Sequence, residues 1–123
     1  MLNLNSILLF SENPKELSEF YKKILEKPAD WSEGGYSGIQ AGDGHLVIGP
    51  HDKVKGKSPN PERIMFNFQT KDVKKDFERI KAIGAKVITE PYNPQENDNK
   101  DSLIATFADP DGNYFQLMSP MEM

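Results

Sequence analysis

The chain has 123 residues, of which 37% are hydrophobic, so its size suits one domain with one continuous core. Its 19 acidic residues outnumber its 15 lysines and arginines, and a formal net charge of −4 without a long basic run argues against nucleic acid as a partner. The lack of cysteine excludes disulfides, thiolate nucleophiles and cysteine-bound zinc, which leaves His45 and His51 as the imidazole groups.

The N-terminus gives no sign of a targeting segment. Met1 to Phe10 form a short apolar run that has neither basic residues before it nor a small-residue cleavage site after it. No other stretch approaches the length of a membrane span. These features predict a cytoplasmic protein that does not bind a membrane.

The first half of the chain predicts one helix among short strands. Residues 3–10 are apolar and too short for a helix, which indicates a buried strand. Asn13 and Pro14 then mark the start of a helix as N-cap and first helical residue. The apolar stripe of this helix is Leu17, Phe20, Tyr21, Ile24 and Leu25. Glycines divide residues 28–50 into three short strands joined by tight turns.

The second half repeats this order after a hydrophilic linker at residues 51–61, which contains two prolines. Ile64, Phe66 and Phe68 alternate with Met65, Asn67 and Gln69, the pattern of a strand with one apolar face. A helix begins near residues 70–72 and ends at Gly84, a residue suited to a left-handed C-cap. Three strands follow at residues 85–91, 102–108 and 113–118, and an Asp-Pro-Asp-Gly turn separates the last two.

Written out, the order is βαβββ, linker, βαβββ, so the chain is an internal repeat. The helical segment at residues 20–25 lies 57 positions before the segment at residues 77–82. We therefore expect an α+β fold in a single domain over residues 1–123. Its boundaries are module one at about 1–50, the linker at about 51–61 and module two at about 62–123.

Three segments resemble the vicinal-oxygen-chelate superfamily, which includes glyoxalases, bleomycin-resistance proteins and extradiol dioxygenases. Residues 105–118 resemble its C-terminal signature, residues 19–25 its first-helix motif and residues 83–87 its second-helix exit. The resemblance implies that each module curls its four strands into half of a barrel-like mixed sheet, with a helix packed outside. The paired halves would enclose a small-molecule cavity.

Metal-dependent members of that superfamily place a ligand, usually His, Glu or Gln, on the first and the last strand of each module. The matching positions here are Asn5, approximately Gly49, Met65 and Gln116. Glycine offers no side-chain donor and methionine only a soft thioether, so this set suits a divalent cation poorly. A shift of the alignment near Gly49 would bring in His45 or His51, but a shift of one residue also reverses the face. We predict no metal and no other cofactor.

The residues expected to line the cavity are Asn5, Ile7, Trp31, His45, Met65, Asn67, Gln69, Tyr114 and Gln116. The amides would supply fixed hydrogen bonds to a partly apolar ligand, although each could equally bridge strands or hold ordered water. Trp31 and Tyr36 could stack on a flat ligand, pack in the core or lie in a dimer interface. His51 follows the pattern of a solvated loop histidine more than that of a mobile base.

Three functions fit this sequence. The favoured one is a small-molecule binding protein of the bleomycin-resistance type, acting as a homodimer without the family metal, and the acidic balance would favour a cationic ligand. The second is a metal-dependent lyase, isomerase or dioxygenase resembling glyoxalase I. The third is a non-catalytic subunit whose surface binds another protein.

Overall fold

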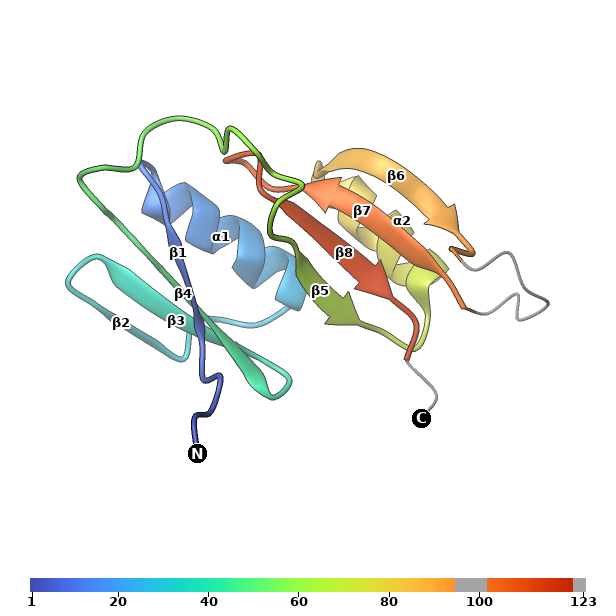
Figure 1. Cartoon of the computed structure of the whole chain (residues 1–123), viewed down its shortest axis with the longest axis horizontal. Helices are drawn as coiled ribbons and strands as arrows, with labels where there is room; N and C mark the ends of the chain where they lie inside the picture. The colour runs from blue at the N-terminus through green and yellow to red at the C-terminus, as the bar shows by residue number, and fades with distance from the viewer. Residues whose placement is uncertain (95–101, 121–123) are drawn as a thin grey trace. The chain divides into compact units, whose positions relative to one another are not determined.

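The computed structural model describes residues 1–94 and 102–120, and it divides the chain into two compact units, Met1–Gly56 and Lys57–Met123 (Figure 1). Each unit has the order βαβββ, which confirms the α+β class and the two predicted modules. The division falls inside the predicted linker, where residues 51–61 form neither helix nor strand.

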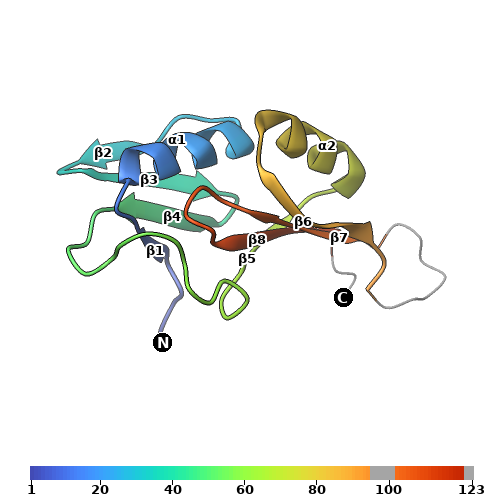
Figure 2. The same ribbon diagram turned by 90° about the horizontal axis from the view of Figure 1, so that it is seen from above.

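Unit 1 is a four-stranded mixed sheet with one helix. Its elements are β1 (Ile7–Phe10), α1 (Pro14–Leu25), β2 (Trp31–Glu33), β3 (Tyr36–Ala41) and β4 (Gly44–Gly49). The strand order is β1-β4-β3-β2, in which β1 runs parallel to β4 and the other pairs are antiparallel. The helix covers one face of this sheet and contacts β3 and β4 (Figure 2).

Unit 2 repeats this topology. Its elements are β5 (Phe66–Gln69), α2 (Val73–Ile83), β6 (Lys86–Tyr92), β7 (Ile104–Ala108) and β8 (Tyr114–Met118). The order is β5-β8-β7-β6, with β5 parallel to β8 and α2 packed on one face. Among the described residues, no helix has the length and apolar content needed to cross a membrane.

The helix starts agree with the sequence patterns, although one cap forms differently. Asp72 caps α2, because its carboxylate accepts a hydrogen bond from Lys75 N at 3.1 Å. Asn13 precedes α1 as predicted, but its side chain makes no cap hydrogen bond. Its own backbone N–H donates instead to Ser11 Oγ at 2.9 Å. The hydroxyl two residues upstream therefore fixes the turn that leads into α1.

The two cores differ in composition. Between α1 and its sheet, the buried apolar residues are Leu9, Leu17, Tyr21, Ile24, Ile39, Leu46 and Ile48. Unit 2 instead stacks phenylalanines: the ring of Phe107 lies 5.1 Å from that of Phe77 and 5.5 Å from that of Phe115. Such offset aromatic pairs add to the stabilisation that burial of apolar surface already supplies.

The first strand of each unit is shorter than its sequence pattern predicts. Pairing of β1 with β4 begins at Ile7, opposite Leu46, so residues 3–6 lie outside the strand. Likewise β5 begins at Phe66, and Ile64 is exposed rather than part of the apolar face. Apolar residues define a strand only where a neighbouring strand accepts their backbone hydrogen bonds.

Candidate ligand-binding site

Each sheet has one face that the helix of its own unit does not cover, and we call it the open face of that unit. In unit 1 the register places Leu8, Val47, Gly38 and Trp31 in one row across all four strands. The buried residues Leu9 and Ile48 alternate with this row and lie on the helix side. The open face of unit 1 therefore begins with an apolar row.

Two aromatic rings of the open face of unit 1 lie directly over glycines. A Cβ atom added at Gly38 would overlap the indole of Trp31, and one added at Gly49 would overlap the ring of Tyr36. The Tyr36 hydroxyl also donates a hydrogen bond to the carbonyl of Pro50 at 3.1 Å. Only glycine leaves room for these rings to lie flat on the sheet. Trp31 is still 47% exposed, so part of this residue is available for contact.

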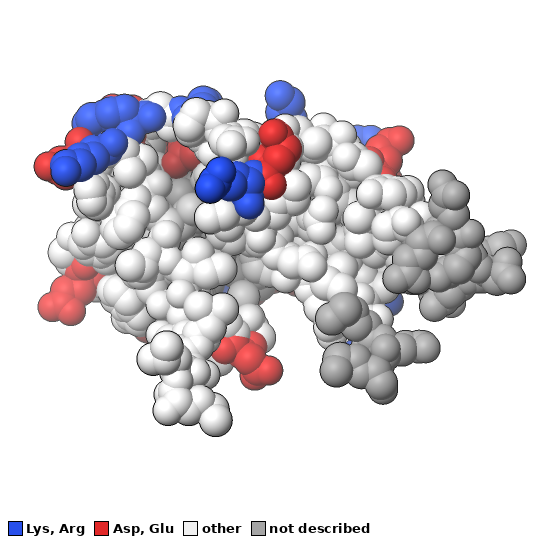
Figure 3. Space-filling model, in the orientation of Figure 1, with Lys and Arg blue, Asp and Glu red and all other residues white. Residues whose placement is uncertain are grey.

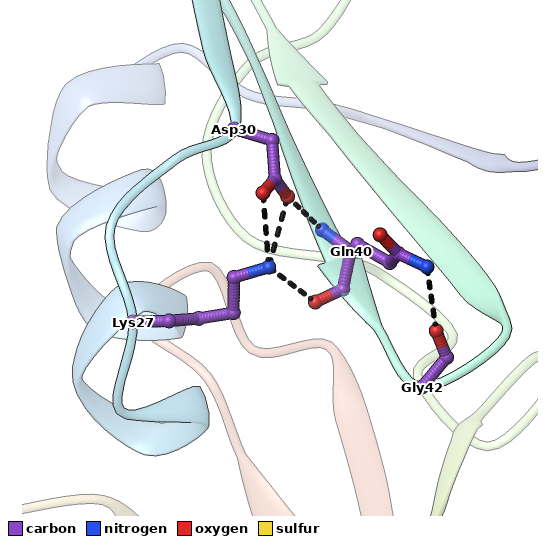
Figure 4. A network of polar contacts seen from close by, with 4 residues as sticks. All are labelled: Lys27, Asp30, Gln40 and Gly42. Carbon is purple, nitrogen blue, oxygen red and sulfur yellow. Dashed lines mark hydrogen bonds and ion pairs between the residues drawn. The ribbon is translucent and has the colours of Figure 1, made fainter.

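A polar network holds the strand that carries Trp31 (Figure 4). Lys27 Nζ donates to both carboxylate oxygens of Asp30, at 3.1 and 3.0 Å, and to the carbonyl of Gln40 at 3.1 Å. Asp30 also accepts a hydrogen bond from Gln40 N at 2.6 Å. That backbone hydrogen bond and the nearby Lys27 ammonium lower the pKa of Asp30 below its usual value of 3.8. The network thus fixes the entry to β2 immediately before Trp31.

The two histidines lie at opposite ends of unit 1. His45 pairs with Gln40 in the register and shares the open face with Val47, and its Nδ1 lies 3.3 Å from the carbonyl oxygen of Asn5. The ring of His51 packs edge-on against Phe10, with 5.1 Å between the centroids. Its Nδ1 accepts a hydrogen bond from Lys53 N at 3.1 Å.

The open face of unit 2 carries amides and hydroxyls. Asn67, Gln116 and Thr106 form one row across β5, β8 and β7. Gln116 Nε2 donates to Thr106 Oγ1 at 3.4 Å, and Asn67 Nδ2 lies 2.9 Å from Met118 Sδ. Tyr114 alternates with the buried Phe115 and so shares this face. Gln69, opposite Met118, also lies on it.

The sequence-based placement on β1 is wrong by one residue. Ile7 lies opposite Leu46 on the helix side, so Leu8 takes the open-face position that was expected for Ile7. Asn5 precedes the strand, and its backbone carbonyl is the group that approaches His45. The run Ile-Leu-Leu-Phe contains no polar residue, so its sequence cannot reveal which side chains face the helix. The open-face residues that the sequence did not reveal are Leu8, Val47, Thr106 and Met118.

The turns before the two helices make the same hydrogen bonds. Ser11 N donates to the Gly49 carbonyl at 3.0 Å, and Thr70 N donates to the Met118 carbonyl at 2.8 Å. Each hydroxyl accepts from the backbone N–H two residues later, at 2.9 Å for Ser11 and 3.2 Å for Thr70. Ser11 therefore corresponds to Thr70, and Gly49 corresponds to Met118.

This correspondence corrects two of the four positions assigned to metal ligands. Counting back from Thr70 and Met118, Met65 corresponds to Ser6 and Gln116 to Val47. The register agrees, because Val47 pairs with β1 as Gln116 pairs with β5. The positions in unit 1 are therefore Ser6 and Val47 in place of Asn5 and Gly49.

The corrected set of four side chains fits a divalent cation no better. It offers one hydroxyl, the methyl groups of Val47, the thioether of Met65 and the amide of Gln116. Hard cations need several carboxylate, imidazole or carbonyl ligands. Within residues 1–94 and 102–120, no group of three or more histidine, aspartate and glutamate side chains could hold an ion.

Charged side chains are sparse over the strands. In the view of Figure 3, the surface over the strands within each unit carries few lysine, arginine, aspartate and glutamate side chains. Most open-face positions agree, since they carry apolar, aromatic, amide and hydroxyl groups, while the charged Glu33 and Lys86 lie on the edge strands β2 and β6. These faces can stack on a ligand and exchange neutral hydrogen bonds with it.

The sequence of this chain matches the profile of one known protein family. Residues 6–118 match the sequence profile named Glyoxalase-like domain. No curated protein matches the chain.

Solved structures share the fold across nearly the whole chain. A glyoxalase-related enzyme from Fulvimarina pelagi has a TM-score of 0.77 and 15% identity, covering 98% of this chain and 89% of the other. A glyoxalase/bleomycin resistance protein/dioxygenase family enzyme from Burkholderia phytofirmans has a TM-score of 0.75 and 18% identity, covering 98% and 100%. TnmS3, an antibiotic binding protein from a Streptomyces species, has a TM-score of 0.71 and 21% identity, covering 98% of each. The TM-scores show a common fold, and at identities of 15–21% the likeness extends to the fold alone.

Proposed function

Because the chain belongs to the glyoxalase-like domain family, we propose that it is a small-molecule binding protein that works without the family's metal site. The observation that carries this proposal is the pair of aromatic rings that lie over Gly38 and Gly49. In addition, the positions that hold metal ligands in metal-dependent members carry poor metal donors here. A protein that binds by stacking and neutral hydrogen bonds requires no ion.

The ligand we propose is flat and largely uncharged. The exposed part of Trp31 offers a stacking surface, and Leu8, at the other end of the same row, is 57% exposed. On the separate open face of unit 2, the amides of Asn67 and Gln116 offer hydrogen-bond donors and acceptors. The fold relative TnmS3 is an antibiotic binding protein, which supports capture of an organic molecule. The acidic balance of the chain suggested a cationic ligand, but the open faces carry few charged side chains and do not favour one.

We propose further that the two units work together as one cytoplasmic domain and that the protein is a homodimer. We also propose that the ligand-binding residues include Trp31, His45, Met65, Gln69 and Tyr114. Analytical ultracentrifugation of the full chain measures the oligomeric state, and a monomer at micromolar concentration would contradict the dimer.

The first experiment measures metal binding. Purified protein is analysed for bound metal and then titrated with Ni²⁺, Co²⁺, Mn²⁺, Fe²⁺ and Zn²⁺ while the unfolding temperature is recorded. An ion that binds the native state at about 100 times its Kd stabilises it by about 2.7 kcal/mol, so specific binding would be evident. We expect no stoichiometric metal and no shift. Tight stoichiometric metal would overturn the proposal and favour the metal-dependent enzyme.

The second experiment uses Trp31, which is the sole tryptophan of the chain. Planar aromatic compounds that stack on the indole should quench its fluorescence in a saturable manner. Compounds that bind equally well to the Trp31→Ala variant, measured by calorimetry, would contradict the proposed stacking surface.

A further inference from the structure

A groove lies on the other side of the unit 1 sheet, between α1 and the β2–β3 hairpin. Its volume is about 400 Å³, which falls within the range of small-molecule pockets, about 300–1,000 Å³. Its polar lining includes Lys15, Ser18, Glu19 and Lys22 from the helix, and Ser32 and Ser37 from the hairpin.

Ser18 is the most informative residue of this groove. It is only 4% exposed, and its Oγ has no hydrogen-bond partner among the residues that the structure describes. A buried hydroxyl without a partner is costly, and natural proteins nearly always satisfy such groups. The helical position also gives Ser18 the option of donating to the carbonyl one turn earlier, yet this hydrogen bond does not form. A ligand in the groove would supply the missing partner.

The hairpin presents two more hydroxyls to the same groove. Ser32 and Ser37 lie opposite each other, with 3.2 Å between their Oγ atoms. Ser37 is in register with the buried Ile48, so both serines lie on the helix side. Each hydroxyl can donate one hydrogen bond and accept two, so the pair keeps capacity for a ligand.

The formal charges around the groove cancel. Lys15 and Lys22 carry two positive charges, and Glu19 and Glu33 carry two negative ones. Lys22 Nζ already donates to Glu19 at 3.0 Å, and that pair lowers the pKa of Glu19 below its usual value. An anion would meet two carboxylates and a cation two ammonium groups. The lining therefore favours a neutral ligand that both donates and accepts hydrogen bonds.

We propose that this groove binds an uncharged polyhydroxylated small molecule, of the size of one or two sugar rings, through the hydroxyls of Ser18, Ser32 and Ser37. The serines of this site lie on the opposite side of the sheet from Trp31 and Gly38. Tyr36, at the end of the hairpin, also lines the groove. The site does not depend on the function proposed for the open faces.

The test is an NMR titration of the ¹⁵N-labelled full chain with trehalose and with myo-inositol. Inorganic phosphate and glycine serve as charged comparison probes. We expect saturable shifts of the backbone amides at positions 18, 32 and 37, with little change at positions 8, 38 and 47. Two results would overturn the proposal: no saturable shift for either polyol, or tighter binding of phosphate or glycine in the groove.

Ser18→Ala provides the decisive variant. Removal of the unpartnered hydroxyl should leave the free protein at least as stable, and it should weaken polyol binding about tenfold, as loss of one buried hydrogen bond does. Thr89→Ala, an exposed hydroxyl of unit 2, is the matched control and should bind like the wild type. Unchanged affinity in Ser18→Ala would overturn the proposal. Stacking of planar compounds on Trp31 should persist in this variant, which keeps the two proposals distinguishable.

Discussion

The two units share one backbone plan but differ in where their tryptophan and phenylalanine rings lie. Unit 1 has a core beneath α1 that is aliphatic apart from Tyr21, and it carries Trp31 and Tyr36 on its open face. In unit 2 the phenylalanines fill the core, and the open face carries amides such as Asn67 and Gln116. The same βαβββ topology therefore supports a stacking surface in one unit and a hydrogen-bonding surface in the other.

This difference shows that the two repeats share a backbone topology but not the side chains of their open faces. Strand alternation, turn hydroxyls and parallel pairing recur in both units, as at Ser11 and Thr70. The identity of the open-face side chains contributes little to core packing, so it is free to differ. Substitutions at four places test this contrast between the units, and we expect the largest effect in the core and the smallest at the surface.

The largest effect is expected for a core aromatic. Phe107→Ala should lower the free energy of unfolding by about 3–5 kcal/mol, because it opens a cavity among stacked rings. Trp31→Ala should cost much less, because the indole is half-exposed on the open face. Urea denaturation followed by circular dichroism measures both. Equal losses in the two variants would contradict the assignment of Phe107 to the core and Trp31 to a surface for binding.

Gly38→Ala should displace the indole without deleting it. The new methyl group would overlap the ring of Trp31, and such overpacking typically costs about 1–3 kcal/mol. The emission maximum should shift to the red, and stacking of planar compounds should weaken about tenfold or more. Gly44→Ala is the matched control in the neighbouring strand, where the nearest atom to the added Cβ is a carbonyl oxygen at 3.7 Å. An unshifted emission in Gly38→Ala would contradict the seating of the ring on the glycine.

The hairpin turns give a third comparison. Asp109 is buried, and its carboxylate accepts from the backbone N–H groups of Asp111 at 2.9 Å and Asn113 at 3.0 Å. Asp109→Ala should lower the free energy of unfolding by about 1–3 kcal/mol, because it leaves those donors without partners. Asp43, in the equivalent turn of unit 1, is exposed, so Asp43→Ala should change stability by less than about 0.5 kcal/mol. Similar losses from both substitutions would show that the turns contribute alike.

The smallest effect concerns the network before Trp31. The pKa of Asp30 is lowered in the folded protein, so its charged form contributes stability above the ordinary aspartate pKa of 3.8. That contribution is lost as the pH falls through the folded-state pKa. Asp30→Asn should therefore be less stable than the wild type at pH 7, and the difference should shrink below pH 3.8. Thermal unfolding across this range measures it, and a difference independent of pH would contradict the ionic role.

Much of unit 2 could be read from the sequence, whereas the open face of unit 1 could not. The alternation of Phe66 and Phe68 with Asn67 and Gln69 identified the polar face of β5. The strand β1 has four apolar residues in a row, and its phase appears only through pairing with β4. The assignment of Ile7 to the cavity failed for this reason, and the position equivalent to Gln116 moved from Gly49 to Val47.

The order of elements, the helix starts, the tight turns and the internal repeat follow from the amino-acid sequence alone, because they depend on local propensity and short-range periodicity. The tertiary structure was needed to show that Trp31 lies on Gly38 and Tyr36 on Gly49, and that Ser18 is buried without a partner among the described residues. The sequence does not reveal which side chain packs over a glycine in a strand. It also does not reveal which surface covers a serine in a helix. Both depend on contacts between residues that are distant in the chain.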